Sequence, residues 1–290
     1  MAPTRDGGVV TEVTPPKTPT GPARRLARSL RGRERWAPSS KLTYRIIGFA
    51  SVIGLLVLWQ IAADNNLVNH ATSSSPSEVW NQARQMVSDG TLGSAVAASG
   101  KLYGVGLGVS VLIGVFGGII LGWWRLLGAI FDPWIAMLYS TPLIAVLPLI
   151  LVWFGINFKG QVVMVVVVSV FPLLVNVMAG VRQVEPRLLR LARSFRGSQL
   201  AILRTLVLPS IVPYIVTGLR LAAGAGLIGV TVAEYFEGEN GVGGVILRAG
   251  TELNTSEVFV GVAVLAGAAL TMTLLIRMVE ARVSGWRDDD

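Results

Sequence analysis

Long runs of apolar residues alternate with short polar connections along most of this chain. About six of these runs approach the roughly 20 residues that a helix needs to cross the hydrocarbon core of a bilayer. They cover residues 46–63, 102–124, 133–155, 162–181, 211–235 and 258–278. The pattern predicts an all-α, polytopic membrane protein whose membrane domain comprises residues 42–281.

The two ends of the chain lack this pattern. Residues 1–41 are rich in Pro, Thr, Gly and Arg without apolar periodicity, which predicts a disordered, basic tail. This stretch is too long for the start of a signal peptide, and the run at 46–63 is long enough to span. We therefore expect that run to remain as the first membrane helix, and residues 282–290 to form a short C-terminal tail.

The polar connection between the first two runs contains an amphipathic helix. Ser75 is the expected N-cap, Pro76 occupies the first helical position, Glu78 completes a capping box and Gly90 ends the helix. Its apolar face consists of Val79, Trp80, Ala83, Met86 and Val87. This face either lies on the membrane surface or packs on a neighbouring outer loop, and the pattern is compatible with both.

Glycines recur in the second run at a small-xxx-small spacing, which allows helices to approach closely in lipid. They are Gly104, Gly108, Gly114, Gly118 and Gly122. A GxGxxG string at Gly224, Gly226 and Gly229 lies inside an apolar run instead of between a strand and a helix. We interpret both sets as packing positions.

Prolines mark the third run. We expect the run to begin at Pro133, because a proline in the first turn loses no helical hydrogen bond. Pro142 and Pro148 lie in its interior, beside Ser140 and Thr141, and free backbone carbonyls. The run is therefore either a bent helix that lines a pathway or a kinked helix that only packs.

Polar residues inside the runs are candidates for a transport pathway, since such residues are rare in membrane helices and usually face protein, a cavity or the interface. The candidates are Ser140, Thr141, Pro142, Asn176, Arg220 and Glu234. Arg220 could alternatively extend to the membrane surface and serve a structural role. Glu234 begins an acidic, glycine-rich connection that continues to Gly244.

Positive charge is distributed asymmetrically along the chain, whose formal net charge is +8. With alternating sides, most arginines fall in the two tails and in the second and fourth connections, all on one side of the membrane. This bias predicts that both termini are cytoplasmic and that basic residues contact anionic membrane lipid. No basic groove interleaved with aromatic residues accompanies them, so we expect no nucleic-acid partner.

The fourth connection, residues 185–209, is rich in arginine. Four apolar residues share one face of a short predicted helix: Leu188, Leu191, Ala192 and Phe195. Gly197 suits the left-handed position after a helix, and Ser198 suits the next N-cap, so two short helices should meet at an angle before Leu208 and Pro209. A partner protein could bind such an elbow.

Motifs for chemistry are scarce. The chain has no GxxxxGK[ST] phosphate loop, GxSxG elbow or HExxH pair. It has no cysteine, and its one histidine, His70, lies in a polar connection. We predict no catalytic residue, no metal and no cofactor, and infer that energy for transport would come from a separate subunit.

Residues 190–209 resemble the cytoplasmic signature of ABC-importer permeases, E-A-A-x-x-x-G followed by nine residues and I-x-L-P. Ala192 matches the second alanine, and residues 206–209 match the end of the signature. Arg190, Leu191 and Arg196 depart from it, standing where it has its acid, its first alanine and its glycine. These departures affect local charge contacts more than the docking role.

Further segments resemble the nitrate, sulfonate and taurine group of these permeases. They are PSEVW at 76–80, PLILVWFGI at 148–156, LARSF at 191–195, LPSIVP at 208–213, GLRLAAG at 218–224 and VAEYFEGENGVGG at 232–244. The resemblance covers roughly residues 42–278. It implies a type I ABC-importer permease fold in a bacterial plasma membrane.

The resemblance also implies a function without enzyme activity in this chain. Two permease copies, a dimer of ATP-binding subunits and an extracytoplasmic substrate-binding protein would import a small anion such as an aliphatic sulfonate, taurine or nitrate by alternating access. The implied ATPase-coupling residues are Ala192, Arg193, Gly197, Ser198, Gln199, Leu206, Leu208 and Pro209.

Two alternatives belong to other classes of protein. A secondary transporter driven by an ion gradient would continue uptake without an ATPase, but the chain lacks the run of intramembrane acids expected of a proton-driven carrier. A membrane-embedded enzyme would need a cluster of polar catalytic groups at one depth, and the sequence indicates none.

Overall fold

The computed structural model describes residues 41–65, 67, 73–237 and 240–284. The tail predicted to be disordered lies outside this part except for Lys41, as do His70 and the end of the chain after Ser284. The chain forms two compact units, Met1–Val57 and Leu58–Asp290. The described part of the first unit belongs to α2 (Lys41–Asp64), whose apolar side chains there are mostly exposed.

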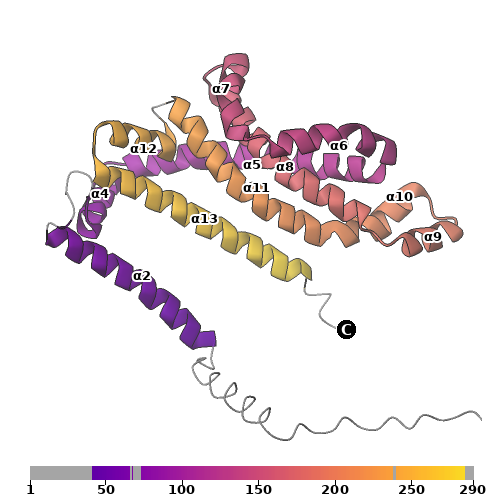
Figure 1. Cartoon of the computed structure of the whole chain (residues 1–290), viewed down its shortest axis with the longest axis horizontal. Coiled ribbons are helices and arrows are strands. Elements are labelled where there is room, and N and C mark those ends of the chain that lie inside the picture. Colours follow the sequence, from indigo (N-terminus) through magenta and orange to yellow (C-terminus); the bar gives the residue numbers. More distant parts are fainter. Residues whose placement is uncertain (1–40, 66, 68–72, 238–239, 285–290) are drawn as a thin grey trace, which may run out of the picture. The chain divides into compact units, whose positions relative to one another are not determined.

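Helices make up the second unit, and its described residues contain no strand (Figure 1). After α2 they are α4 (Pro76–Ser88), α5 (Thr91–Trp123), α6 (Arg125–Ser140), α7 (Leu143–Phe154), α8 (Phe158–Arg182), α9 (Pro186–Ser194), α10 (Gln199–Ile202), the π-helical turn η2 (Leu203–Val207), α11 (Leu208–Glu237), α12 (Gly241–Thr251) and α13 (Thr255–Ser284). The predicted all-α class is confirmed.

Among the described residues, five helical stretches are long and apolar enough to cross a membrane. They are Ile46–Asp64, Thr91–Trp123, Phe158–Arg182, Gln199–Phe236 and Thr255–Arg282. The bent pair of α6 and α7 makes a sixth if it is counted as one span. By length and composition, the predicted number of about six spans is confirmed.

The third predicted run is not one helix. It is divided between α6 and α7, which are bent by 101° where Thr141 and Pro142 separate them. Thr141 is extended, with φ −76° and ψ 137°, as the residue before a proline prefers. The prediction that Pro133 begins the run is wrong: α6 begins at Arg125, and Pro133 lies inside it. Membrane helices tolerate such a proline because neighbouring groups satisfy the freed carbonyl.

The second predicted run begins too late. α5 starts at Thr91, directly after Gly90, whose φ of 81° ends α4 as expected. Hydropathy locates only the part of a helix that lies in lipid, and nothing between Gly90 and Leu102 interrupts the helix. α5 therefore extends beyond its membrane part.

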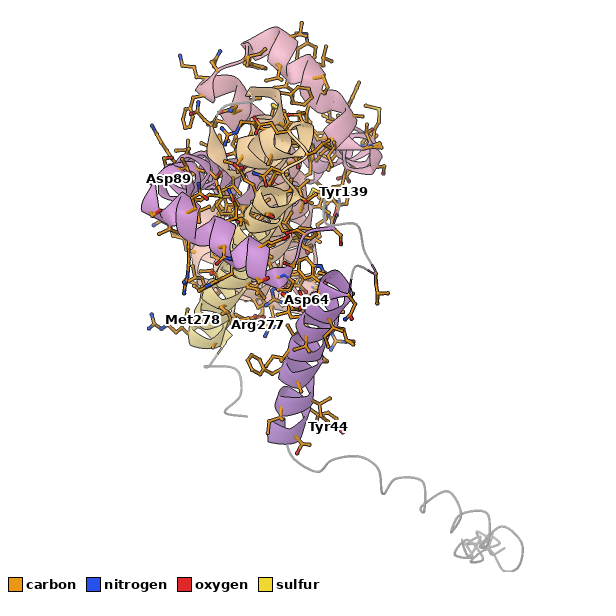
Figure 2. The ribbon with its side chains drawn as sticks, turned by 90° about the vertical axis from the view of Figure 1, so that its left-hand side faces the viewer. Tyr44, Asp64, Asp89, Tyr139, Arg277 and Met278 are labelled. Atoms are coloured by element: carbon orange, nitrogen blue, oxygen red, sulfur yellow. The ribbon has the colours of Figure 1, made fainter. Side chains whose placement is uncertain are left out.

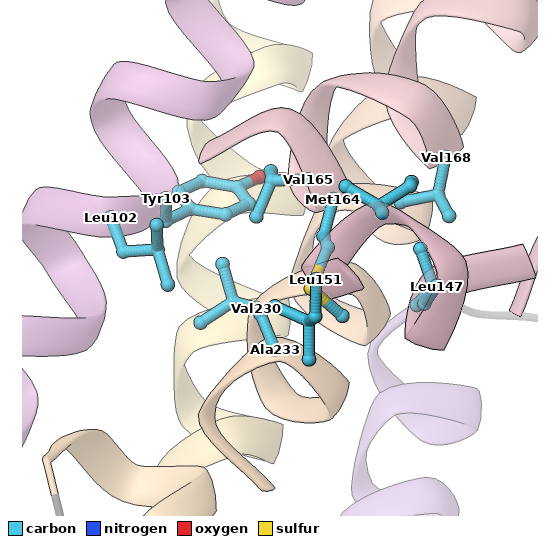
Figure 3. Close-up of a cluster of buried hydrophobic side chains, with 10 residues drawn as sticks. Leu102, Tyr103, Leu147, Leu151, Met164, Val165, Val168, Val230 and Ala233 are labelled. Atoms are coloured by element: carbon cyan, nitrogen blue, oxygen red, sulfur yellow. The ribbon is translucent and has the colours of Figure 1, made fainter. Parts of the chain in front are cut away.

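The core of the bundle is organised around α8, which packs against both α5 and α11. Its fourteen buried residues occupy most of its length. Figure 3 shows one cluster, in which Tyr103 of α5, Leu147 of α7, Met164 of α8 and Val230 of α11 meet. The Tyr103 hydroxyl donates a hydrogen bond of 3.0 Å to the carbonyl of Ala223.

Close packing between α5 and α8 depends on a stripe of small residues spaced four apart. It consists of Gly106, Ser110, Gly114, Gly118 and Gly122, which are buried or half-buried. A Cβ at Gly118 would lie 2.7 Å from the Cβ of Val177. Gly104 and Gly108 have no atom within 4 Å of such a position, so the prediction that they pack within the bundle of this chain is wrong. They are two residues, or about 200°, away from the stripe.

The GxGxxG string packs, as predicted, at two of its three glycines. A Cβ at Gly226 would lie 2.9 Å from the Ser169 hydroxyl, and one at Gly229 would lie 2.5 Å from a methyl of Val168. Gly224 has nothing within 4 Å. The string therefore brings α11 against α8.

The amphipathic helix α4 packs on its neighbours. Its N-cap is Ser75, whose hydroxyl accepts from the N–H of Glu78 at 3.3 Å. Met86 is buried in a cluster with residues of α5, α12 and α13, and Val79 and Ala83 pack against the same cluster. Of the two alternatives for α4, packing on neighbouring elements is therefore the one observed, although Trp80 and Val87 stay exposed.

Much of the bundle surface is apolar. Side chains such as Tyr139 on α6 and Met278 on α13 project from the ribbon (Figure 2), and they are 47% and 56% exposed. Exposed apolar area on this scale is expected where lipid or another protein, and not water, surrounds the helices.

Candidate coupling elbow and transport pathway

The elbow, residues 185–209, folds as two helices joined by a tight turn. α9 ends at Ser194, and the N–H of Gly197 donates to the carbonyl of Ala192 at 3.2 Å. Ser198 then caps α10, its hydroxyl accepting from the N–H of Ala201 at 3.2 Å. The predicted break and the predicted N-cap are both confirmed.

The left-handed residue in this turn is Arg196, and not Gly197 as predicted. Arg196 has φ 56°, a conformation that costs a residue with a side chain roughly 1–2 kcal/mol. Gly197 is needed for space instead, because a Cβ there would lie 2.9 Å from the carbonyl oxygen of Ala192. Arg196 stands at the signature position that is glycine in the family, so the substitution leaves strain in the backbone.

The second helix of the elbow does not stop before Leu208 and Pro209, which corrects the sequence-based expectation. α10 continues through the π turn into α11, and the N–H of Leu208 donates to the carbonyl of Leu203. The wider turn accommodates Pro209, which has no N–H to donate in the first turn of α11. The elbow is thus joined to α11 without a loop.

The predicted coupling residues divide into two groups. Arg193, Gly197, Ser198 and Gln199 are exposed, whereas Ala192, Leu206, Leu208 and Pro209 are half-buried. Leu206 and Leu208 pack on a core cluster that contains Val207 and Ile211. The second group anchors the elbow, and the first is available to a partner.

An apolar surface accompanies the exposed arginines of α9. Leu188, Leu191 and Phe195 are 43%, 55% and 79% exposed. Arginine and apolar side chains together are typical of protein interfaces. The elbow therefore has the composition of a docking element.

Replacing Arg196 by glycine should stabilise the turn of the elbow by about 1 kcal/mol, because glycine adopts positive φ without steric cost. The expected result is slower hydrogen exchange of the amides around Ser198. Arg190→Gly is the control: the exposed Arg190 lies in the middle of α9, where glycine costs about 1 kcal/mol, so exchange should become faster. Equal rates of amide hydrogen exchange in the two variants would contradict the assignment of strain to Arg196.

Three of the pathway candidates lie at the break between α6 and α7. Ser140 ends α6, Thr141 is half-buried and Pro142 is exposed. The Thr141 hydroxyl donates to the carbonyl of Met137 at 2.8 Å, which satisfies one backbone group near the break. Irregular backbone at membrane depth needs protein or a watery cavity around it.

Two other candidates make contacts within the bundle. The side-chain amide of Asn176, in α8, donates to the carbonyl of Pro172 at 2.7 Å. Arg220 forms an ion pair with Glu280, which links α11 to α13. This contact favours the structural alternative for Arg220.

The last candidate, Glu234, is 2% exposed and caps α12. Its carboxylate accepts from the Ser99 hydroxyl at 2.6 Å and from the N–H of Gly243 at 2.7 Å. Ser99 in turn accepts from the N–H of Val242 at 2.8 Å. Glu234 thus joins α11, α5 and the N-terminus of α12, where negative charge is favoured.

α12 and Ser99 are the parts of this region that sequence reasoning missed. The glycines at the start of α12 indicated a loop. A helical signal was nevertheless present, since Val242, Val245, Ile246 and Ala249 follow the i, i+3, i+4, i+7 spacing and are all buried.

The pathway candidates do not converge within one chain. Glu234 lines a cavity of about 200 Å³, and none of the other five candidates lines it. α12 and the elbow helices α9 and α10 lie at opposite ends of the bundle (Figure 1). In the part of the chain that the structure describes, no cluster of three or more His, Cys, Asp or Glu residues could hold a metal ion.

The helical spans, the broken helix and the exposed elbow define a multi-pass permease. Residues 110–285 match the family described as binding-protein-dependent transport system inner membrane component, and the chain belongs to this family. It is therefore an ABC-importer permease of the inner membrane, with the type I importer fold that the signature implied.

Two relatives are similar over nearly their whole length. The taurine transport system permease protein TauC of Escherichia coli is 30% identical over 266 residues, which cover 90% of this chain and 96% of that protein. The bicarbonate transport system permease protein CmpB of Synechococcus elongatus is 26% identical over 262 residues, 86% of this chain and 92% of that protein. The predicted nitrate, sulfonate and taurine type of permease is confirmed at the level of the family.

Proposed function

We propose that this chain is the membrane-spanning subunit of an ATP-driven importer that passes a small solute from an external binding protein to the cytoplasm. Family membership supports the class, and the missing phosphate loop supports a separate ATPase. The names of the relatives, taurine and bicarbonate permeases, favour a small solute that carries an acidic group. Aliphatic sulfonates, taurine and nitrate, the solutes that the sequence resemblance implied, are all candidates of this kind.

The elbow is the proposed joint with the ATPase, and its exposed surface is the observation that carries the proposal. Residues 198–204 would enter a groove of the ATP-binding subunit while Leu206 and Leu208 hold the elbow on the bundle. Two permease copies would work with two such subunits. ATP binding would draw these subunits together, and the elbow would transmit the movement to the spans.

The proposal requires that the elbow and both termini are cytoplasmic, as the distribution of arginine predicts. The connection between α12 and α13, which contains Asn254, would then face outward. The mechanism would be alternating access, with no bond chemistry in this chain.

Cross-linking from the elbow tests the proposal. The chain has no native cysteine, so Ser198→Cys provides a unique thiol on an exposed N-cap. A short bifunctional reagent should link it to the ATP-binding subunit, and a membrane-impermeant maleimide should not label it in intact cells. Asn254→Cys is the control, with the opposite result expected in both assays.

The outcome separates importer from secondary transporter. Absent cross-links in an assembled complex, or labelling of Ser198→Cys from outside, would refute the coupling assignment. Uptake that persists with a hydrolysis-deficient ATPase and collapses with the proton gradient would favour the secondary transporter. The solute itself is best found by measuring which candidates stimulate ATP hydrolysis by the reconstituted complex with its binding protein.

A further inference from the structure

The exposed face of α4 carries a stripe of apolar and basic side chains. Trp80, Arg84 and Val87 follow the i, i+4, i+7 spacing of one helical face, and all three are exposed. The Arg84 guanidinium lies 5.0 Å from the centre of the Trp80 ring, a cation–π contact, and none of the ion pairs that join described residues includes it. Tryptophan and arginine are enriched among the residues that contribute most to protein interfaces. The stripe therefore has the composition of a binding surface.

α4 packs on a part of α5 that extends beyond the neighbouring span. The Lys101 ammonium is 5.1 Å from the centre of the Phe158 ring, so Lys101 of α5 and the start of α8 lie at similar depth. Ala95 and Thr91 precede Lys101 in α5 by about 9 and 15 Å, at 1.5 Å per residue. The cluster that buries Met86 of α4 includes Ala95. α4 is thus held on this extension.

The start of α8 marks the edge of the membrane. The 25 residues of α8 measure about 38 Å, against about 30 Å for the hydrocarbon core and about 40–45 Å for the bilayer with both headgroup layers. Each headgroup layer is therefore only roughly 5–8 Å thick. A helix that packs 9 to 15 Å beyond the end of α8, by the same rise of about 1.5 Å per residue, lies outside this layer. The stripe on α4 therefore faces water, and lipid does not cover it.

A strained residue lies at the same end of the bundle. Leu253, between α12 and α13, has φ 60° and is 77% exposed. Such a conformation is unfavourable for a residue with a side chain and persists only where the surroundings impose it, here through the N–H of Asn254, which donates to the carbonyl of Ala249 at 2.8 Å. A hydrogen bond of 2.9 Å between the hydroxyls of Ser74 and Ser256 joins the start of α4 to the start of α13. The fold thus fixes an exposed leucine beside α4 at a cost to its own stability.

We propose that Trp80, Arg84, Val87 and Leu253 form a docking surface for the extracytoplasmic binding protein. The family of this chain is described as binding-protein-dependent, and the proposed topology places α4 and the connection between α12 and α13 on the outer side. The aqueous position requires a soluble partner. The positive charge of Arg84 favours a partner with carboxylates around an apolar pocket that receives Trp80. The proposal rests on the proposed function and specifies where its external partner binds.

Titration of the reconstituted importer with its purified binding protein tests the docking surface. Trp80→Ala should raise the concentration that half-maximally stimulates ATP hydrolysis about tenfold or more. Hydrolysis without binding protein should stay unchanged, because Met86 and not the exposed ring holds α4. Gln85→Ala, which shortens an exposed side chain on another face of α4, is the control and should have no effect. Equal half-maximal concentrations for the two variants would overturn the proposal.

Charge and strain give two further tests in the same assay. Arg84→Glu should weaken docking more at low salt than at high salt, since salt screens exposed charges. Leu253→Gly should keep or raise the melting temperature, because glycine adopts positive φ without steric cost, and should nevertheless require more binding protein. Unchanged half-maximal stimulation of Leu253→Gly would contradict the role assigned to this leucine.

A spin label distinguishes a protein from lipid as the occupant of the stripe. The sequence has no cysteine, so Val87→Cys provides a single thiol for a nitroxide. In lipid nanodiscs the nitroxide should be accessible to a water-soluble nickel chelate and should lose mobility when binding protein is added. Access to lipid-dissolved oxygen instead, without a response to binding protein, would assign the stripe to the membrane and overturn the proposal.

Failure of the docking surface and failure of the proposed function give different results. The spin-label measurement needs only the permease and the binding protein, whereas cross-links from Ser198→Cys report on the ATP-binding subunit. Cross-links without a response of the label would overturn the docking surface alone. A response of the label without cross-links would overturn the ATPase assignment and leave the docking surface in place.

Discussion

Gly241→Ala should unfold the start of α12 and abolish uptake. Gly241 has φ +84°, which a residue with a side chain adopts only at a cost, and its Cβ would overlap the Glu234 carboxylate. Left-handed strain and overpacking together predict a loss of about 2 to 5 kcal/mol. The hydrogen bonds that the Glu234 carboxylate accepts from the Ser99 hydroxyl and the N–H of Gly243 would be disturbed at the same time.

A thermal melt of the purified protein and an uptake assay measure this effect. Gly250→Ala is the matched control, because Gly250 lies in the same helix and has nothing within 4 Å of its Cβ position. It should be neutral or slightly stabilising, since alanine favours helix over glycine by about 1 kcal/mol. Equal melting temperatures for the two variants would contradict the role assigned to Gly241.

Gly118→Val should separate α5 from α8 and reduce the yield of folded protein. The added Cβ would lie 2.7 Å from the Cβ of Val177 and 2.9 Å from the carbonyl oxygen of Leu174, and neither a β-branched side chain nor the backbone can rotate away. Overpacking of this kind costs about 1 to 3 kcal/mol, and helix association in lipid depends on close packing.

Size-exclusion chromatography in detergent and a thermal melt will detect the change. The control is Gly108→Val in the same helix, where no atom lies within 4 Å of the new Cβ. A variant of Gly118 that melts at the same temperature as the variant of Gly108 would show that the stripe does not hold the two helices together.

The membrane spans could be predicted from hydropathy because a helix that crosses lipid must be apolar over a minimum length. This requirement does not depend on how the helices pack against one another. It did not predict where helices end outside the lipid, so the extension of α5 to Thr91 and the whole of α12 were missed. The break at Pro142 was visible as a proline, but Pro133 and Pro148 gave the same local signal and lie inside helices. Tertiary contacts decide which proline interrupts the chain.

The candidate sites were predictable to different degrees. Ser198 caps α10 through a contact with a residue three positions away, and such local chemistry can be inferred from sequence. The cap that Glu234 provides for α12 depends on Ser99, 135 residues away along the chain, and no sequence pattern relates the two. No sequence pattern singled out Lys101, because its place in a cavity follows from the packing of three helices.

The continuous helix from Gln199 to Phe236 connects the two regions. Its 38 residues give a length of about 57 Å at 1.5 Å per residue, well beyond the roughly 30 Å of the hydrocarbon core. The elbow lies at one end of this rod and Glu234 near the other. A tilt of the rod about a point between them moves the ends in opposite directions. If the elbows of two such chains moved together on one side of the membrane, the opposite ends of their helices would therefore move apart on the other side. No loop interrupts the helix between its two ends, so none of this displacement would be lost.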